Sequence, residues 1–321
     1  MSQALFDCAE RFSASLLQLA VTNDRICIVI NDSAETHHAT AFQMRFPERI
    51  IDVGIAEQNM VGVAAGLANA GRIAFVHSAS CFLTARAMEQ IKADVAYSNN
   101  NVKLCGFVSG VAYGALGGTH HSLEDLAWMR AIPNLRVAAP ASPNDTAAVV
   151  RAAVAVEGPV FIRVISKTGV PEIFPADHAF EFGRGHRLRR GADVGLIGTG
   201  VMTSRLLDVA ERLEELGISA SVFHMGSISP IDEALIAEAA RSTGRLVVAE
   251  EHYVTGGLGG AVAEVVVRHA PVPMLLLGAP HAFAPIGPAG FLFDHFGLTP
   301  EKLTVGISAW LAQTAPVRQA G

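Results

Sequence analysis

The most informative part of the sequence is IDVGIAEQNMVGVAAGLANAG, residues 51–71. Its pattern predicts a buried strand, a tight turn and a helix made largely of Ala, Gly and Val. The helix opens with one carboxylate, Glu57, and the stretch contains no basic residue. An unpaired buried charge costs several kcal/mol. Glu57 is therefore either a surface acid favoured by the helix dipole or a residue with a chemical role.

Strand-like and helix-like runs alternate on both sides of this stretch. The strand-like runs are residues 25–30, 50–53, 72–77, 102–109, 135–139 and 159–164. The helix-like runs are residues 5–20, 56–70, 83–98 and 143–156. This alternation predicts an α/β fold whose sheet is mostly parallel and doubly wound, with helices on both faces.

A second alternation follows a segment that lacks the pattern. Residues 166–193 contain prolines and charges without periodicity, so we expect a linker at 169–192 between domains at 1–168 and 193–321. The later strand-like runs are residues 193–199, 219–224, 245–250 and 273–277. The later helix-like runs are residues 202–216, 231–242, 257–269, 289–296 and 300–313. The second domain is therefore expected to be a second doubly wound sheet.

Composition argues against several kinds of partner. The 321 residues carry 24 basic and 30 acidic side chains, a net charge of −6, with no basic run. That balance argues against binding to nucleic acid or to an anionic membrane surface. No apolar run has the length of a membrane span, and no signal peptide is visible at the start. The four cysteines lack CxxC spacing, and we expect a cytoplasmic protein.

Common cofactor and metal motifs are missing from the sequence. GLIGTGVMT, residues 195–203, has two glycines of a dinucleotide fingerprint but lacks the third. There is no P-loop, no GxSxG elbow and no HExxH motif. The pairs His37–His38 and His120–His121 are adjacent, so their side chains diverge and do not easily share a metal. We expect no metal site within this chain.

Polar and aromatic residues follow four of the predicted strands. Asp32, Glu57 and Phe82 each come shortly after a strand, and His120 lies in the Gly-rich loop after the fourth. In an open parallel sheet, the carboxyl ends of the strands form the ligand crevice. The four residues are therefore expected to meet at one edge of the first sheet.

Longer segments resemble the transketolase family. The segments are DVGIAEQNMVGVAAGLANAG, GGTHHSLEDLAWMRAIPNLRVAAPAS, EGPVFIRV, ISPIDEALI and VVAEEHYVTGGLGGAVAEVV. They occur in the order and spacing of that family's pyrimidine-binding domain followed by its C-terminal domain. The resemblance covers essentially the whole chain and implies an enzyme dependent on thiamine diphosphate.

The resemblance implies roles for the residues at the sheet edge. Glu57 would hydrogen-bond N1′ of the cofactor's aminopyrimidine, so that N4′ can take the proton from C2 of the thiazolium. A buried carboxyl with a raised pKa suits this exchange. Phe82 resembles the aromatic that packs on the pyrimidine, and Arg86 stands where a second aromatic is common. Asp32 resembles an aspartate near the cofactor, and His120 resembles the histidine that meets the substrate carbonyl.

The likeness departs from the family at the substrate positions. Val108 and Leu116 stand where common transketolases carry a histidine and an aspartate. The arginine that grips sugar phosphate has no clear counterpart, and Arg163 or Lys167 is expected to replace it. The remaining candidates for substrate contact are Thr36, His37 and His121. The usual pentose phosphates are therefore in doubt as substrates.

The family's diphosphate-binding half is absent from the sequence. No GDG occurs anywhere, although the family holds the diphosphate and Mg²⁺ (or Ca²⁺) through a GDG…N motif. The resemblance therefore implies the C-terminal half of a split transketolase, a separate pyrimidine-binding chain. Together with a GDG…N subunit it would transfer a two-carbon ketol unit between sugars. We expect an α2β2 assembly in which this chain also self-associates.

Two other functions remain open from the residues. One is the β chain of a 2-oxoacid dehydrogenase or a ligase like deoxyxylulose-phosphate synthase, and the other is an inactive scaffold homologue. In the C-terminal part, Glu250 and Glu251 end a strand, and we expect a structural domain that stabilises a dimer and contains a buried ion pair. The alternative is that His252 reaches a substrate or a partner chain. The segment GAPHAFAPIGPAGFLF, residues 278–293, departs from the family's D-x-F-G pattern, with no role assigned to it.

Overall fold

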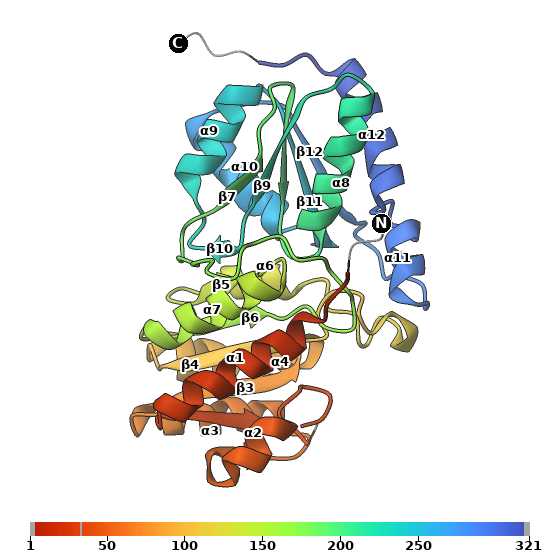
Figure 1. The fold of residues 1–321 in the computed structure, drawn as a ribbon. Coiled ribbons are helices and arrows are strands. Elements are labelled where there is room, and N and C mark those ends of the chain that lie inside the picture. Colours follow the sequence, from red (N-terminus) through yellow and green to blue (C-terminus); the bar gives the residue numbers. More distant parts are fainter. Residues whose placement is uncertain (1–3, 33, 318–321) are drawn as a thin grey trace.

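The computed structural model describes residues 4–32 and 34–317. The ends of the two expected domains, residues 1–3 and 318–321, lie outside the described residues. The chain forms two sheets, one in each half of the molecule, with helices covering both faces of each sheet (Figure 1). This arrangement confirms the predicted α/β class. Within the described residues, no helix is long and apolar enough to cross a membrane.

The first sheet has seven strands in the order β10-β5-β6-β4-β3-β1-β2. Its strands are β1 (Ile26–Ile30), β2 (Ile50–Asp52), β3 (Ile73–Ala79), β4 (Val102–Phe107), β5 (Arg136–Ala138), β6 (Val160–Arg163) and β10 (Ser227–Ser229). Every pairing is parallel except that of β10 with β5. The carboxyl ends of β1 to β4 and β6 therefore lie at one edge, where ligands bind in such sheets.

Helices cover both faces of this sheet because its strands are apolar on both faces. In β1, Ile26, Ile28 and Ile30 face a core shared with α1, α2 and α7, whereas Cys27 and Val29 face α3, α4 and α6. The helices are α1 (Cys8–Thr22), α2 (Thr40–Arg45), α3 (Glu57–Asn69), α4 (Ser80–Arg86), α6 (Asp125–Arg130) and α7 (Pro143–Ala155), with a short helical turn η1 (Pro47–Arg49).

The helix expected over 83–98 is broken in the structure. Helix α4 ends at Arg86, a short turn α5 (Met88–Gln90) follows, and η2 (Ile91–Tyr97) is π-helical. A π-helical segment widens the turn, and such segments are often found at functional sites. Here the break places Arg86 at the exposed end of α4 rather than in the middle of a long helix.

The second sheet has five strands in the order β12-β11-β8-β9-β7. Its strands are β7 (His186–Arg189), β8 (Val194–Gly198), β9 (Ala220–His224), β11 (Leu246–Tyr253) and β12 (Met274–Ala279). Its helices are α8 (Met202–Glu215), α9 (Glu233–Thr243), α10 (Leu258–His269), α11 (Ala289–His295) and α12 (Pro300–Gln313). Helices α8, α11 and α12 share a core on one face, and α9 and α10 pack on the other.

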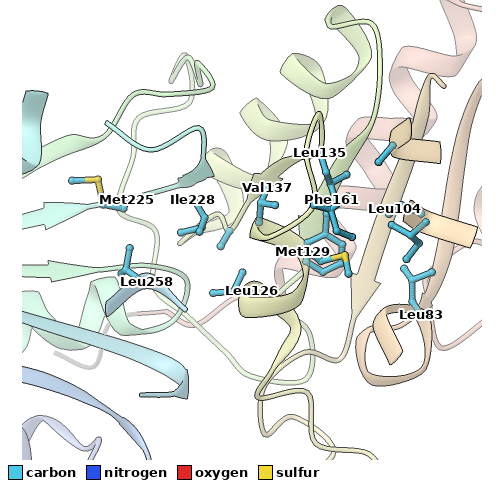
Figure 2. Packing of buried hydrophobic residues seen from close by; sticks show 14 of the residues in the cluster. Leu83, Leu104, Leu126, Met129, Leu135, Val137, Phe161, Met225, Ile228 and Leu258 are labelled. Carbon is cyan, nitrogen blue, oxygen red and sulfur yellow. The ribbon is translucent and has the colours of Figure 1, made fainter. Parts of the chain in front are cut away.

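The two halves share strands and core. Strand β7 lies within the segment expected to be a linker, and β10 from the second half extends the first sheet. Figure 2 shows Met225, Ile228 and Leu258 of the second half beside Leu126 and Val137 of the first. One apolar core therefore extends from the first sheet to the second, and residues of both halves pack together in it.

Candidate active site

A pocket of about 360 Å³ opens at the carboxyl edge of the first sheet. Its lining comes from the residues after β1, β2 and β3 and from the long loop after β4. The lining residues are Asn31, Asp32, His37, Ile55, Glu57, Ala79, Phe82, Arg86, Tyr113, Leu116 and His120. The four residues expected to meet at this edge, Asp32, Glu57, Phe82 and His120, are all among them.

Glu57 is buried and has charged and polar partners. It begins α3, and its side chain is only 3% exposed. Arg86 Nη1 donates to both carboxylate oxygens at 3.1 Å, and Asn31 Nδ2 donates to Oε1 at 3.1 Å. Arg86 lies far from Glu57 in the sequence, and the packing of α4 beside α3 brings it there. The burial of Glu57 is therefore offset by a cation and an amide, as buried carboxylates require.

Aromatic rings and a guanidinium form one wall of the pocket. Arg86 Cζ lies 4.0 Å from the centroid of the Phe82 ring, within cation–π distance. The His120 ring meets Phe82 edge-on at 5.1 Å and Tyr113 at 5.9 Å, measured between centroids. Thr119 Oγ1 lies 2.9 Å from His120 Nδ1 and orients the ring. With Nδ1 engaged, Nε2 is left to meet a ligand.

Polar groups at the end of β1 complete the pocket. Asn31 Nδ2 also donates to Ser78 Oγ at 3.0 Å, while its buried Oδ1 has no hydrogen-bond partner within the described residues. His37 is buried, and burial lowers its pKa to about 4, so its ring is neutral at pH 7. Asp32 is exposed and adopts φ of 65°, and its N–H donates to Asp52 Oδ1 at 3.1 Å.

The remaining expected substrate residues lie outside the lining. Arg163 is 2% exposed, and its guanidinium donates to the carboxylates of Asp125 and Glu251. His121 is buried, and its Nε2 lies 3.2 Å from the carbonyl oxygen of Gly114. Thr36 is half-buried, next to His37.

Lys167 is exposed close to the pocket. Its Nζ lies 5.6 Å from the centroid of the Tyr113 ring, which lines the pocket. Arg163 and Lys167 were both expected to bind an anionic group of the substrate. Of these two, Arg163 is held in a buried ion pair and Lys167 is not.

Sequence reasoning missed four lining residues, which are Asn31, Ile55, Ala79 and Tyr113. Asn31 directly follows β1, so the rule that found Asp32 also applies to its neighbour. Tyr113 belongs to the Gly-rich loop after β4, and nothing in the sequence indicates that its side chain lines the pocket, whereas Leu116 of the same loop was expected at a substrate position.

The pocket has the groups that an aminopyrimidine needs. Glu57 offers a buried carboxylate to a ring nitrogen, Phe82 offers an aromatic surface, and Asn31 Oδ1 is a buried acceptor without a partner among the described residues. A second cavity of about 630 Å³, lined by residues 55–59 and Arg86, shares Ile55, Glu57 and Arg86 with this pocket. Within the described chain, no group of three or more His, Cys, Asp or Glu residues is arranged to hold a metal ion.

Comparisons with known proteins give one consistent result. Residues 6–168 match the family "Transketolase, pyrimidine binding domain", and residues 183–303 match "Transketolase, C-terminal domain". The chain is 38% identical over 305 residues to a protein of Phocaeicola vulgatus named as a subunit of apulose-4-phosphate transketolase, covering 94% of this chain and 97% of that one.

Two further comparisons agree. The chain is 38% identical over 288 residues to the 6-deoxy-6-sulfo-D-fructose transketolase subunit SqwH of a Clostridium species, covering 90% of this chain and 89% of that one. A solved structure described as a split gene transketolase, inactive beta4 tetramer, superposes with a TM-score of 0.88 at 38% identity. It covers 97% of this chain and 100% of that one.

Proposed function

The chain belongs to the transketolase family, and from that membership we propose that it is the pyrimidine-binding half of a split, thiamine-diphosphate-dependent transketolase. The reaction is transfer of a two-carbon ketol unit between sugars. One observation carries the proposal: the buried carboxylate of Glu57 opens into a pocket walled by Phe82 and His120. The alternatives, a 2-oxoacid dehydrogenase β chain, a synthase-type ligase or an inactive scaffold, have weaker support, because relatives matched over nearly their full length are named transketolase subunits.

Glu57 is the residue that would hold the aminopyrimidine. When bound, thiamine diphosphate supplies a carbon nucleophile and an electron sink. The carboxylate of Glu57 would share a proton with N1′, and Phe82 would pack against the ring face. Arg86 compensates the charge of Glu57, and its side chain is half-exposed. Asp32 and Asn31 line the same pocket and would bind the cofactor's polar groups.

His120 is positioned to act on the substrate. Thr119 holds its Nδ1, and the ring lies against Phe82 at the pocket wall. Its Nε2 donates a hydrogen bond to the substrate's carbonyl oxygen and stabilises the negative charge that develops there. The neutral ring of His37 either donates a hydrogen bond to a sugar hydroxyl or accepts one from it.

Lys167 is the better candidate for holding an anionic group of the substrate. Arg163 is committed to two buried carboxylates, so gripping a ligand would break that network. Leu116 makes part of the lining apolar where common transketolases have a polar side chain. Two relatives are named for sugars carrying a phosphate or a sulfonate. We therefore propose an anionic sugar other than the usual pentose phosphates, bound with its charge toward Lys167.

A partner chain completes the site. The sequence has no GDG motif, and the diphosphate and its Mg²⁺ or Ca²⁺ therefore require a separate GDG…N chain. The similar split-gene structure is described as an inactive β4 tetramer, which supports both self-association and dependence on a partner. The active assembly is α2β2. All four cysteines are free and buried, consistent with a reducing cytoplasm.

Reconstitution tests the proposed function. The chain is mixed with its GDG…N subunit, thiamine diphosphate and Mg²⁺, and CO₂ release from hydroxypyruvate is followed with an aldose acceptor. Activity that requires both chains is the expected result. Turnover by this chain alone would overturn the assignment. It would also be overturned if the mixture transferred nothing to any aldose but did act on a 2-oxoacid with a lipoyl acceptor.

A further inference from the structure

The loop that carries His120 is closed at its base by a backbone bridge. Gly110 N–H donates to Ser122 O at 3.1 Å, and Ser122 N–H donates to Gly110 O at 2.9 Å. Between these residues the chain leaves the first sheet and presents Tyr113, Leu116 and His120 to the pocket. The segment 110–122 is here called the His120 loop. Its shape decides where the His120 ring stands.

Glu251 of the C-terminal domain holds the base of this loop. Its Oε1 accepts the Val111 N–H at 2.9 Å, and its Oε2 accepts from Arg163 at 3.4 Å. Arg163 in turn donates to the carbonyl oxygens of Ser122 and Glu251. Gly110, at φ of 63°, lies directly against the carboxyl group, so a Cβ there would overlap Glu251. Burial raises the pKa of Glu251, although the charge of Arg163 opposes that shift.

A second contact holds the far side of the His120 loop. Gly287 N–H donates to Gly114 O at 3.2 Å, and His121 Nε2 lies 3.2 Å from the same oxygen. A Cβ on Gly114 would overlap the Gly287 carbonyl and lie 2.7 Å from Leu292 Cδ1. Ile286 covers Gly117, whose Cβ would lie 3.0 Å from Ile286 Cγ1. This close approach requires glycine at position 114, because a side chain there would overlap the Gly287 carbonyl oxygen.

The C-terminal domain therefore contacts the His120 loop at its start, through Glu251, and at its middle, through Ile286, Gly287 and Leu292. We propose that Glu251 and the turn around Gly287 are positioning residues, which set the place of His120 for the reaction. The segment 278–293 thereby gains a role: it clamps the loop that meets the substrate. The consequence for activity rests on the function proposed above, whereas the clamp itself does not.

Hydrogen exchange of the chain tests the clamp without any assay of activity. Gly114→Ala adds one methyl group at the contact with Gly287, and amide exchange across 111–121 should rise about tenfold while β4 stays protected. The matched control is Gly290→Ala in α11, where the same methyl group meets nothing within 4 Å. Equal exchange rates in the two variants would overturn the clamp.

A second variant guards against misfolding of the first. Ile286 is 71% exposed, so Ile286→Ala removes only the cover over Gly117 and leaves the cores intact. About threefold faster exchange in the loop is expected. If Gly114→Ala does not fold, amide exchange in Ile286→Ala decides the test. Unchanged amide exchange across the His120 loop in Ile286→Ala would then refute the clamp.

A double-mutant cycle in the reconstituted enzyme tests whether the clamp acts through His120. Gly114→Ala should lower kcat about tenfold with little change in KM, and it should cost almost nothing further in a His120→Ala background. A purely structural role predicts the same fractional loss in both backgrounds and would overturn the positioning role. Full activity of His120→Ala alone would instead refute the proposed part of His120 in the reaction, and the exchange rates would still decide the clamp.

Discussion

Glu57 shows how one buried charge is tolerated in an apolar helix. The stretch around it contains no basic residue, and the sequence could indicate only that the acid needs a reason to be there. The structure supplies Arg86 and Asn31, both of which come from other elements. Position along the chain predicted which residues meet at the sheet edge, because strand ends converge. It could not predict the ion pair, because that depends on how α3 and α4 pack against each other.

Replacing Glu57 with Gln should abolish turnover in the reconstituted complex. The amide cannot exchange a proton with N1′ as a carboxylate does, and a loss of at least about 10²-fold in kcat is expected. The chain should still fold, which circular dichroism and the thermal midpoint check. Turnover near the unsubstituted level in Glu57→Gln would contradict the mechanism.

Lys167 and Arg163 should respond to substitution in different ways. Lys167→Ala should raise KM for an anionic sugar about tenfold, a loss of about 1.4 kcal/mol, and leave the free energy of unfolding unchanged. Arg163→Met should instead lower the free energy of unfolding by about 3–5 kcal/mol, because Asp125 and Glu251 would be buried without their cation.

Urea unfolding and initial-rate kinetics separate these two effects. If Lys167→Ala left KM unchanged, this lysine would have no part in binding the sugar. If Arg163→Met were as stable as the unsubstituted chain, the buried network would not stabilise the fold as described.

Among the elements, strands within an apolar run could be predicted, including the three-residue strands β2 and β5, whereas β7 and β10 could not. Strand β1 is buried on both faces, so its pattern is visible without any partner. Strands β7 and β10 have four and three residues and depend on distant partners, so the local sequence carries little signal for them. The break after α4 was likewise missed, because the apolar spacing of 83–98 suits a continuous helix.

A buried carboxylate joins three elements that the sequence did not connect. Asp145 of α7 accepts from His178 Nε2 at 3.1 Å and from His224 Nε2 at 3.0 Å, and His224 belongs to β9. Burial by itself would raise the pKa of Asp145. The hydrogen bonds from His178, His224 and the Ala141 N–H outweigh burial and hold this pKa well below its ordinary value of 3.8.

This arrangement predicts how stability depends on pH. Because the pKa of Asp145 is lower in the folded chain, its contribution is fully present above about pH 4 and is lost as the pH falls below that value. The difference in free energy of unfolding between the unsubstituted chain and Asp145→Asn should therefore shrink between about pH 5 and pH 3. Urea titrations at the two pH values measure it, and a constant difference would contradict the ionised Asp145.

In the proposed function, the whole molecule supplies half of an enzyme site from two joined domains. The first sheet provides the pocket and its carboxylate, and the C-terminal domain contacts the loop that carries His120. The expectation of a separate diphosphate-binding chain rests on motif content alone, because no GDG occurs in the sequence. The contacts of segment 278–293 could not be predicted, because they depend on Gly114 and Gly117 meeting residues from a distant part of the chain.

We propose above all that this chain supplies the pyrimidine site but not the diphosphate site. The sharpest test is isothermal titration calorimetry with thiamine diphosphate and Mg²⁺, first on the purified chain and then on its mixture with the GDG…N subunit. We predict no detectable binding by the chain alone and tight, Mg²⁺-dependent binding by the mixture. Glu57→Gln in the mixture should bind the cofactor more weakly. Tight, Mg²⁺-dependent binding by the chain alone would contradict a site divided between two chains.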